Sequence, residues 1–261
     1  MITLSDVTKT YSSDVQIGPV NLPIPPGGVT TRGGPNGAGK STLLTMIGRL
    51  LGIDAGVIEI AGLDVAATKS NDLAKVVSIL RQENSFITRL TVRQLVGFGR
   101  FPHSKGRLTA ADEEAISQAI DFLDMTELEG RYLDQLSGGQ RQRANVAMVL
   151  AQDTEYVLLD EPLNNLDMKH SVQMMQHLRR GGGGRRPLAG GALHRGRTIV
   201  VVLHDINFAA NYSDLICAVK DGAIVEFGPP SYIMDPARLS AIFGTPVNVF
   251  QCPSGPFAVY F

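Results

Sequence analysis

The sequence predicts an α/β fold with a mainly parallel sheet, an N-terminal antiparallel β sub-domain and an inserted α-helical sub-domain. Two nearly unbroken apolar runs, Tyr156–Leu159 and Thr198–Leu203, each lead into charged residues. Runs of this kind are typical of strands that are buried on both faces of a parallel sheet. A glycine-rich loop at Gly34–Ser41 leads into a predicted helix at Thr42–Leu51. This strand–loop–helix order completes the basis for the α/β prediction.

Short strands and turns are predicted for the first part of the chain. The strand signals are the runs Ile2–Val7, Val15–Ile17 and Val20–Ile24, and they stop at Pro25–Gly28. Proline and glycine interrupt regular structure, so this segment is expected to turn before the glycine-rich loop.

A helical sub-domain is predicted in the middle of the chain. Val76–Leu80 is a short apolar run, and the pattern after it is helical. Thr109 and Asp112 are spaced as in a capping box, and apolar residues then recur on one helical face. The face consists of Ile116, Ala119, Ile120 and Leu123. We therefore place a helical sub-domain at 83–151, inserted into a core formed by 1–82 and 152–261.

The last third of the chain contains a predicted hairpin. Asp221 and Gly222 separate the runs Ile216–Val219 and Ala223–Phe227. An Asp-Gly pair between two apolar runs is a strong hairpin signal. A helical stretch and terminal strands are expected from there to Phe261.

Composition excludes several classes of protein. The 261 residues are 44% hydrophobic and 19% charged, with a net charge of −1. This balance suits a packed domain and gives no general attraction to nucleic acid, which is not an expected partner. Cys217 and Cys252 are too few for a disulfide framework or a zinc site. The N-terminus lacks a signal-peptide pattern, and no run approaches the ~18 apolar residues of a membrane span, so any membrane component is expected on another chain.

The glycine-rich loop has the spacing of a phosphate-binding loop. GPNGAGKS satisfies Gly, four residues, Gly, Lys, Ser. In such a loop backbone N–H groups and the lysine, here Lys40, surround nucleotide phosphates, and the hydroxyl of Ser41 is the expected Mg²⁺ ligand. The following helix adds its N-terminal dipole. Alone, this motif predicts only ATP or GTP binding, and a plain glycine-rich turn is the alternative.

Charged residues follow both predicted buried strands. Asp160 and Glu161 end the first, and His204 ends the second. Ligand-binding groups gather at the carboxyl ends of strands in open α/β sheets. Asp160 occupies the place at which phosphate-loop NTPases hold Mg²⁺. A solvated acidic pair would be the alternative without the phosphate loop.

One further motif narrows the function. Leu136–Gln140 spells LSGGQ and lies between the phosphate loop and the acidic pair. With these companions the chain resembles the ATPase subunit of an ABC transporter over nearly its whole length. The resemblance implies a phosphate-loop NTPase core of the RecA-like type, ATP and Mg²⁺ as cofactors, and ATP hydrolysis by a translocase-class enzyme. It also implies that the LSGGQ residues, which are the family's signature motif, face ATP held by a second copy of the chain.

The resemblance assigns roles to individual residues. Glu161 matches the catalytic carboxylate, and His204 the switch histidine that contacts the γ-phosphate. Gln82 matches the Q-loop glutamine, which senses Mg²⁺ or water. With Lys40 these form the catalytic set, and Ser41, Gln82 and Asp160 form the magnesium set. The nucleotide-binding set is Tyr11, Gly34, Pro35, Asn36, Gly37, Ala38, Gly39, Lys40, Ser41, Thr42, Ser137, Gly138, Gly139, Gln140 and Asp167.

Three of these assignments, those of Tyr11, Gln82 and His204, have plain alternatives. Gln82 lies in the short string RQE, so a polar loop residue is its alternative. Tyr11 is similar to the aromatic that stacks on adenine, and an aromatic near a strand end is commonly a core residue. Asn165, Leu166 and Asp167 resemble the D-loop, which couples the two sites of the dimer. A lone histidine is usually structural, although the string LHD favours the switch role for His204.

Two segments depart from the family pattern. The strand before the phosphate loop contains Arg32, and a buried arginine is costly unless an acid pairs with it or its head reaches solvent. Four glycines at Gly181–Gly184 should end the preceding helix, and Arg179–Arg197 holds six arginines and no acid. We expect a disordered surface loop at 181–197. A regulatory or anionic-lipid contact and an altered reading frame are the alternatives.

A finer resemblance concerns the transported cargo. The strings LTVRQLVGFGRFPHSKGRL and PLNNLD are similar to the ATPases that drive bacterial uptake of iron–siderophore complexes, with haem and cobalamin importers as relatives. The implied partners are a second ATPase subunit, an integral membrane permease and, indirectly, a substrate-binding protein, at the cytoplasmic face of the membrane. A soluble ABC ATPase that acts on DNA or ribosomes and a regulatory module without turnover are the alternatives.

Overall fold

The computed structural model describes residues 1–12, 15–82, 89–181, 196–253 and 255–260. The chain forms two compact units, and each is described by itself. The first unit comprises 1–68 and 198–261, and the second comprises 69–197. The predicted boundaries of the core and the helical sub-domain remain a prediction.

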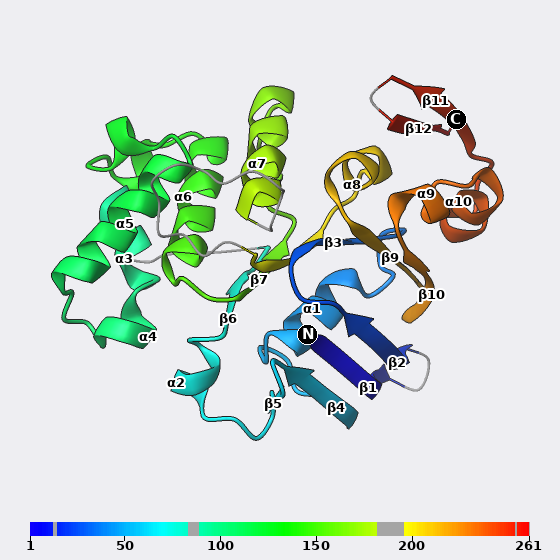
Figure 1. Ribbon diagram of the computed structural model, residues 1–261, viewed down its shortest axis with the longest axis horizontal. Helices are drawn as coiled ribbons and strands as arrows, with labels where there is room; N and C mark the ends of the chain where they lie inside the picture. Colours follow the sequence, from blue (N-terminus) through cyan, green and yellow to red (C-terminus); the bar gives the residue numbers. More distant parts are fainter. Residues whose placement is uncertain (13–14, 83–88, 182–195, 254, 261) are drawn as a thin grey trace. The chain divides into compact units, whose positions relative to one another are not determined.

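A four-stranded antiparallel sheet opens the first unit, as predicted (Figure 1). Its order is β2-β1-β4-β5. Alternate residues of β1, such as Ile2 and Leu4, are buried, and Leu4 is opposite Leu22 of β2. One face therefore belongs to the core. The strands are β1 (Ile2–Ser12), β2 (Val15–Ile24), β4 (Ala55–Ile60) and β5 (Leu63–Asp64).

Parallel strands form the second layer of this unit. β3 pairs in parallel with both β8 and β9, and β9 pairs antiparallel with β10. Every residue of β8 is buried, which confirms the prediction from its apolar run. Helix α1 is the next element after β3. The bounds are β3 (Gly28–Gly33), α1 (Lys40–Ile47), β8 (Thr198–Val202), β9 (Leu215–Lys220) and β10 (Ala223–Gly228).

The Asp-Gly hairpin is also confirmed. Asp221 and Gly222 join β9 to β10 with φ angles of 48° and 75°. Positive φ at both central residues is what a type I′ turn requires, and this turn matches the twist of the flanking strands.

The C-terminal helices and strands share an apolar cluster that includes Ile206, Ile216 and Ala258. A helical stretch and terminal strands were expected here. The elements are α8 (Ile206–Tyr212), α9 (Pro230–Ile233), α10 (Pro236–Phe243), β11 (Asn248–Cys252) and β12 (Gly255–Val259).

The second unit combines two parallel strands with a group of helices (Figure 1). β6 (Val77–Leu80) pairs with β7 (Tyr156–Asp160), and all of β7 is buried. Helices α3, α5 and α6 pack against one another. The helices are α2 (Ser70–Leu73), α3 (Val92–Phe98), α4 (Phe101–Ser104), α5 (Ala110–Phe122), α6 (Gly138–Ala151) and α7 (Met168–Gly181), with 3₁₀ turns at Thr126–Leu128 and Leu133–Gln135.

The predicted start and buried face of α5 are both present. Thr109 is the N-cap, and its side chain and that of Asp112 form a capping box. The predicted apolar face is buried, with exposures of at most 1% for Ile116, Ala119, Ile120 and Leu123.

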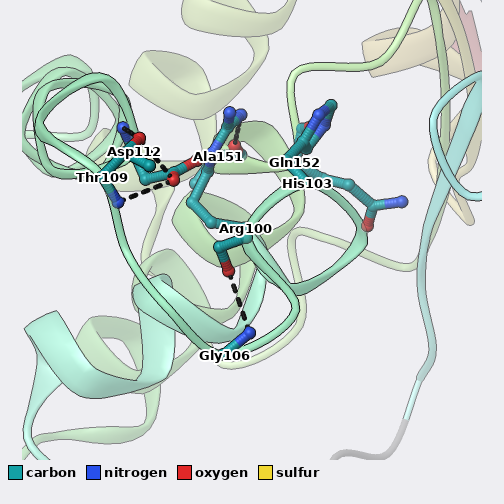
Figure 2. A network of polar contacts seen from close by, with 8 residues as sticks. Arg100, His103, Gly106, Thr109, Asp112, Ala151 and Gln152 are labelled. Atoms are coloured by element: carbon teal, nitrogen blue, oxygen red, sulfur yellow. Dashed lines mark hydrogen bonds and ion pairs between the residues drawn. The ribbon is translucent and has the colours of Figure 1, made fainter.

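A buried ion pair joins α5 to the turn before α4 (Figure 2). Arg100 Nε donates to Asp112 Oδ1 over 2.9 Å, and the side chains are 10% and 5% exposed. Burial disfavours the charged carboxylate, but hydrogen bonds from the Thr109 backbone and hydroxyl and from Arg100 outweigh it. They lower the pKa of Asp112 to about 2.

Arg32 is fully buried in β3. It lies opposite Val202 of β8 and Cys217 of β9, so its guanidinium does not reach solvent. Burial raises the pKa of the Cys217 thiol, and the Arg32 charge opposes that rise.

The glycine run coincides with a helix end. Helix α7 ends at Gly181. The predicted disordered loop falls largely on 182–195, which lie outside the described residues. Beyond them, the Arg197 backbone N–H donates to the Gly181 carbonyl, and Arg197 forms a 2.6 Å ion pair with Asp153.

Replacing Arg32 with leucine should stabilise the protein. Arg32→Leu removes the desolvation cost of a buried guanidinium, which can exceed its favourable contacts by roughly 1 to 4 kcal/mol. We expect a rise of several degrees in the melting temperature in a thermal scan. An unchanged or lower value would show that the fold already accommodates Arg32 well.

Removing the Asp112 carboxylate should weaken the fold and flatten its acid response. The folded pKa of Asp112 is depressed, so its contribution is present above the unfolded pKa of about 4 and is lost as pH falls toward about 2. A shift of this size corresponds to about 2 kcal/mol. Between pH values of about 4 and about 2, the free energy of unfolding measured with urea should change by about 2 kcal/mol less in Asp112→Asn than in the wild type. Asp134→Asn, which disrupts the exposed ion pair with Arg89, should leave the pH dependence of the free energy of unfolding unchanged.

Candidate functional site

The predicted phosphate loop joins β3 to α1 in the first unit. Gly34 has a φ of 138°, and a Cβ there would lie 2.0 Å from the Val219 carbonyl oxygen. Only glycine therefore fits at this position. Gly39 is the N-cap of α1 in a left-handed conformation and offers no side-chain cap. The first N–H groups of α1 thus lack a side-chain acceptor at the cap, as in helix N-termini that bind phosphate.

Lys40 begins α1 and is folded back over the loop. Its side chain is buried, and its ammonium donates to the carbonyl oxygens of Gly34 and Pro35 over 2.9 and 2.8 Å. Ser41 and Thr42 follow in the first turn of the helix. The positive charge therefore lies at the mouth of the loop, where phosphate would bind.

The β9–β10 hairpin supports the loop, which the sequence did not reveal. The backbone N–H of Gly222 donates to the Ala38 carbonyl over 3.2 Å, and the N–H of Gly18 donates to Gly222 over 2.9 Å. These bonds tie the loop both to the hairpin and to β2. Because they are backbone contacts between distant segments, only the Asp-Gly turn signal pointed toward them.

His204 lies at the same sheet edge as the loop. Arg32 and Val202 are register partners in the parallel strands β3 and β8, and Gly34 and His204 each follow two residues later. His204 thus follows the carboxyl end of β8, and the phosphate loop follows the carboxyl end of the neighbouring strand β3. His204 is exposed.

Tyr11 lies near the end of β1, and it is 54% exposed rather than part of the core. Lys9, two residues before Tyr11 on the same strand, is opposite Ile17 of β2. Ile17 in turn lies within 4 Å of the place where a Cβ on Gly39 would be. An exposed aromatic near the loop fits the predicted adenine contact, which remains a proposal.

In the second unit, Glu161 follows β7 in a strained conformation. Asp160 ends the strand, and both acids are buried. Glu161 has a φ of 49°, which is uncommon for a residue with a side chain and occurs mainly where function or packing requires it. Gln82 and Asn164 both donate side-chain amide N–H groups to Glu161 Oε2, over 3.1 and 2.7 Å.

The structure thus brings Gln82 and Glu161 together through this hydrogen bond, and the roles assigned to them stay predictions. Asn164 is an additional site residue that sequence reasoning did not assign. It lies in the quoted string PLNNLD, but that string was used only as a family marker. Its spacing from Glu161, three residues along a turn, is the signal that could have identified it.

The LSGGQ residues form the beginning of α6. Ser137 is its exposed N-cap and forms a capping box with Gln140, with bonds of 3.2 and 3.0 Å. A Cβ on Gly138 or Gly139 would lie 3.1 Å or 2.9 Å from atoms of Asn165. The glycines therefore let the D-loop pack against the helix start.

Two other contacts complete this group. Gln142 donates to the Glu161 carbonyl over 3.4 Å, so α6 is also bonded to the strand end. Asp167 accepts hydrogen bonds from the backbone and the ring of His170, which lower the pKa of Asp167. Asp167 thus caps α7.

The predicted site residues fall into two groups. The loop, Tyr11 and His204 lie in the first unit, while Gln82, the acidic pair, the signature residues and the D-loop lie in the second. Across the described parts of the chain, three or more His, Cys, Asp or Glu side chains never cluster as metal ligands would.

Comparison with known proteins identifies the family. Residues 17–164 match the ABC transporter family. The chain belongs to the ABC transporter family. It is 62% identical to the petrobactin import ATP-binding protein FatE of Bacillus anthracis, with 100% of both chains covered. It is 46% identical to the petrobactin import ATP-binding protein YclP of Bacillus subtilis, again over 100% of both.

More distant relatives and solved structures agree with membership of this family. The iron(3+)-hydroxamate import ATP-binding protein FhuC of Bacillus subtilis is 38% identical, over 93% of this chain and 87% of FhuC. The dimeric ATP-binding cassette MJ0796 bound to ADP and Pi has a TM-score of 0.76 at 28% identity, over 88% of this chain and 99% of MJ0796. A putative metal-chelate type ABC transporter shares the fold, with a TM-score of 0.81 at 23% identity and coverage of 100% and 96%.

Within the residues that can be described, the helices are too short or too polar to span a membrane.

Asn164 should contribute to turnover through its bond to Glu161. Asn164→Leu removes an amide donor to a carboxylate, an interaction worth about 1.5 to 3 kcal/mol. We expect kcat for ATP hydrolysis to fall about tenfold or more. ATP binding should change little, since the phosphate loop belongs to the other unit.

Asn21→Leu is the matched control for this change. Asn21 also donates its amide to a carboxylate, that of Asp6, over 2.8 Å in the N-terminal sheet. It should leave kcat unchanged in the same steady-state assay. Equal activity of the two variants would contradict a role for Asn164.

Proposed function

We propose that the protein is the ATP-binding and ATP-hydrolysing subunit of an ABC importer that drives uptake of an iron–siderophore complex through a separate permease. The observation that carries the hydrolytic part is the Glu161 carboxylate, held by Gln82 and Asn164 at the end of a buried strand. The cargo follows from the importer names of the relatives, and petrobactin is the first siderophore to test.

ATP fits the donor groups of the phosphate loop. The buried Lys40 ammonium and the N–H groups at the start of α1 supply positive charge and donors for a triphosphate. The exposed Tyr11 offers a face for adenine. Pro35, Asn36 and Ala38 contribute backbone to the loop, which the β9–β10 hairpin holds in place.

The residues proposed to hold magnesium carry the oxygen donors that this ion prefers. Ser41 offers a hydroxyl and Asp160 a carboxylate, which are the hard ligands that Mg²⁺ prefers, and Gln82 adds an amide oxygen. When bound, the ion neutralises charge on the β- and γ-phosphate oxygens. Asp160 ends β7 directly before Glu161, so the two carboxylates have separate tasks.

Glu161 orients and polarises the attacking water. The two amide donors fix one oxygen of its carboxylate, and the strained backbone fixes its direction. His204 is exposed at the same sheet edge as the phosphate loop, which supports a contact between its ring and the γ-phosphate. Lys40 then stabilises the charge that develops on the transferred group.

Two copies enclose two ATP molecules in this proposal. Ser137 and the following glycines present the N-terminus of the 14-residue helix α6, with Ser137 exposed. Such a terminus favours negative charge and suits the γ-phosphate held by the other copy. The dimeric MJ0796 structures support dimerisation.

The permease is the proposed membrane partner, with the ATPase at the cytoplasmic face. Phe98 and Phe101, at the α3–α4 junction, are 52% and 61% exposed. Neighbouring exposed aromatic side chains favour a protein partner. A substrate-binding protein would act indirectly through the permease.

Glu161→Gln tests the hydrolytic assignment. It removes the base but keeps a side chain of similar shape, so turnover should fall about 10²-fold or more while ATP still binds. Because the variant should retain unhydrolysed ATP, it should elute from a size-exclusion column with the mass of a dimer, as measured by light scattering. Turnover at the wild-type rate would remove Glu161 from the mechanism.

Ser137→Glu in the same background is the control for dimerisation. The first turn of α6 contains no acid, and a negative charge introduced there should repel the phosphate, so this double variant should stay monomeric with ATP. For transport, the wild-type protein should co-purify with a polytopic permease and support ⁵⁵Fe-petrobactin uptake. Uptake of haem or cobalamin instead would correct the cargo.

A further inference from the structure

The carboxyl end of helix α6 is bonded by two side chains from one short segment. Arg100 Nη1 donates to the Ala151 carbonyl over 2.9 Å, and His103 Nε2 lies 2.9 Å from the Gln152 carbonyl (Figure 2). A carbonyl only accepts, so this bond places a proton on Nε2. The final carbonyls of a helix have no partner within it, and a cation there also suits the helix dipole.

Arg100 is itself held firmly. Its Nε donates to Asp112, whose other oxygen accepts from the Thr109 backbone over 2.9 Å and from the Thr109 hydroxyl over 2.7 Å. The guanidinium therefore joins the start of α5 to the end of α6 (Figure 2). Because both partners are buried, water competes little for these bonds.

The backbone beside Arg100 also contacts α6. A Cβ on Gly99 would lie 2.1 Å from the Met148 carbonyl oxygen, so only glycine allows this approach. The segment Gly99–His103 thus contacts α6 through backbone and side chains along its last turn. We call this segment the α6 brace.

The same helix end is tied to the strand that leads to Gln82. The side-chain amide of Gln152 donates to the carbonyls of Ala74 and Val77, over 2.6 and 3.1 Å. Val77 begins β6, which ends two residues before Gln82. The end of α6 is therefore connected through β6 to Gln82, which donates a hydrogen bond to Glu161.

We propose that Arg100 is a positioning residue that sets the placement of α6, the helix that begins with the LSGGQ residues. A helix of 14 residues is about 21 Å long and rigid, so a tilt at its carboxyl end displaces Ser137 at the other end. Gln142, between the two ends, bonds the Glu161 backbone and would move as well. Arg100 touches no proposed substrate group and acts through α6.

The inference rests on the proposed function, because the placement of Ser137 matters only if that residue meets ATP. A loosened α6 should impair closure around ATP and lower kcat. The phosphate loop lies in the other unit, so the ATP concentration for half-maximal rate should change little. A general loss of folding would instead change both quantities.

The test compares Arg100→Met with Arg93→Met. Arg93 lies on α3 and donates to Glu113, Ser117 and Glu129, over 2.7, 3.1 and 2.9 Å. It thus bridges α3 to α5 and the following turn without a described bond to α6. Each variant loses a multidentate arginine, but only one loses the brace.

Arg100→Met should lower kcat at least tenfold at saturating ATP, with the half-saturating ATP concentration within twofold of wild type. Hydrogen exchange of the amides in the last turn of α6 should accelerate at least tenfold. Arg93→Met should keep kcat and this exchange within twofold. Arg100→Lys should recover part of the loss, since it retains the charge but has one donor nitrogen in place of the Nε and Nη1 that bond Asp112 and Ala151.

Wild-type kcat in Arg100→Met, or an equal loss in Arg93→Met, would overturn the proposal. If Arg100→Met does not fold by circular dichroism, His103→Leu takes its place. A loss in kcat of more than twofold with faster α6 exchange then supports the brace, and unchanged exchange overturns it. Absence of turnover in the wild type would instead reject the proposed function, whereas the exchange experiment needs no turnover.

Discussion

The Glu161 carboxylate is the point on which the second unit depends. Gln82 reaches it from the end of β6, Asn164 from the following turn, and Gln142 bonds its backbone from α6. Three segments are thereby held to one strained residue. Strain of this kind persists only where the surroundings over-determine the conformation, and these bonds supply that determination.

The phosphate loop follows the same principle with backbone instead of side chains. Gly34 lies against the Val219 carbonyl, and Ala38 accepts a hydrogen bond from Gly222, so the hairpin fixes the loop. The geometry requires close approach, which explains why glycine occurs at these positions. Each unit therefore holds its own proposed site residues in place through hydrogen bonds within that unit.

The sequence predicted whatever local pattern or motif determines. The apolar runs of β7 and β8, the capping box of Thr109 and the Asp-Gly turn depend on neighbouring residues, and all were confirmed. Asn164 and Gln142 were not predicted, because their roles come from contacts with Glu161 rather than from a periodic pattern. For Arg32 the sequence left its environment open, and only the strand order shows that it is fully buried.

The packing of helix α6 explains why this helix also needs hydrogen bonds from polar side chains. Its buried surface includes the small residues Ala144, Ala147 and Ala151. Small apolar residues permit close packing, but hydrophobic burial is non-directional and resists sliding or tilting of a helix only weakly. Hydrogen bonds have defined geometry, so bonds at the middle and at the carboxyl end fix both the axial position and the tilt of α6. The proposed dimer would demand that precision from the serine at its other end.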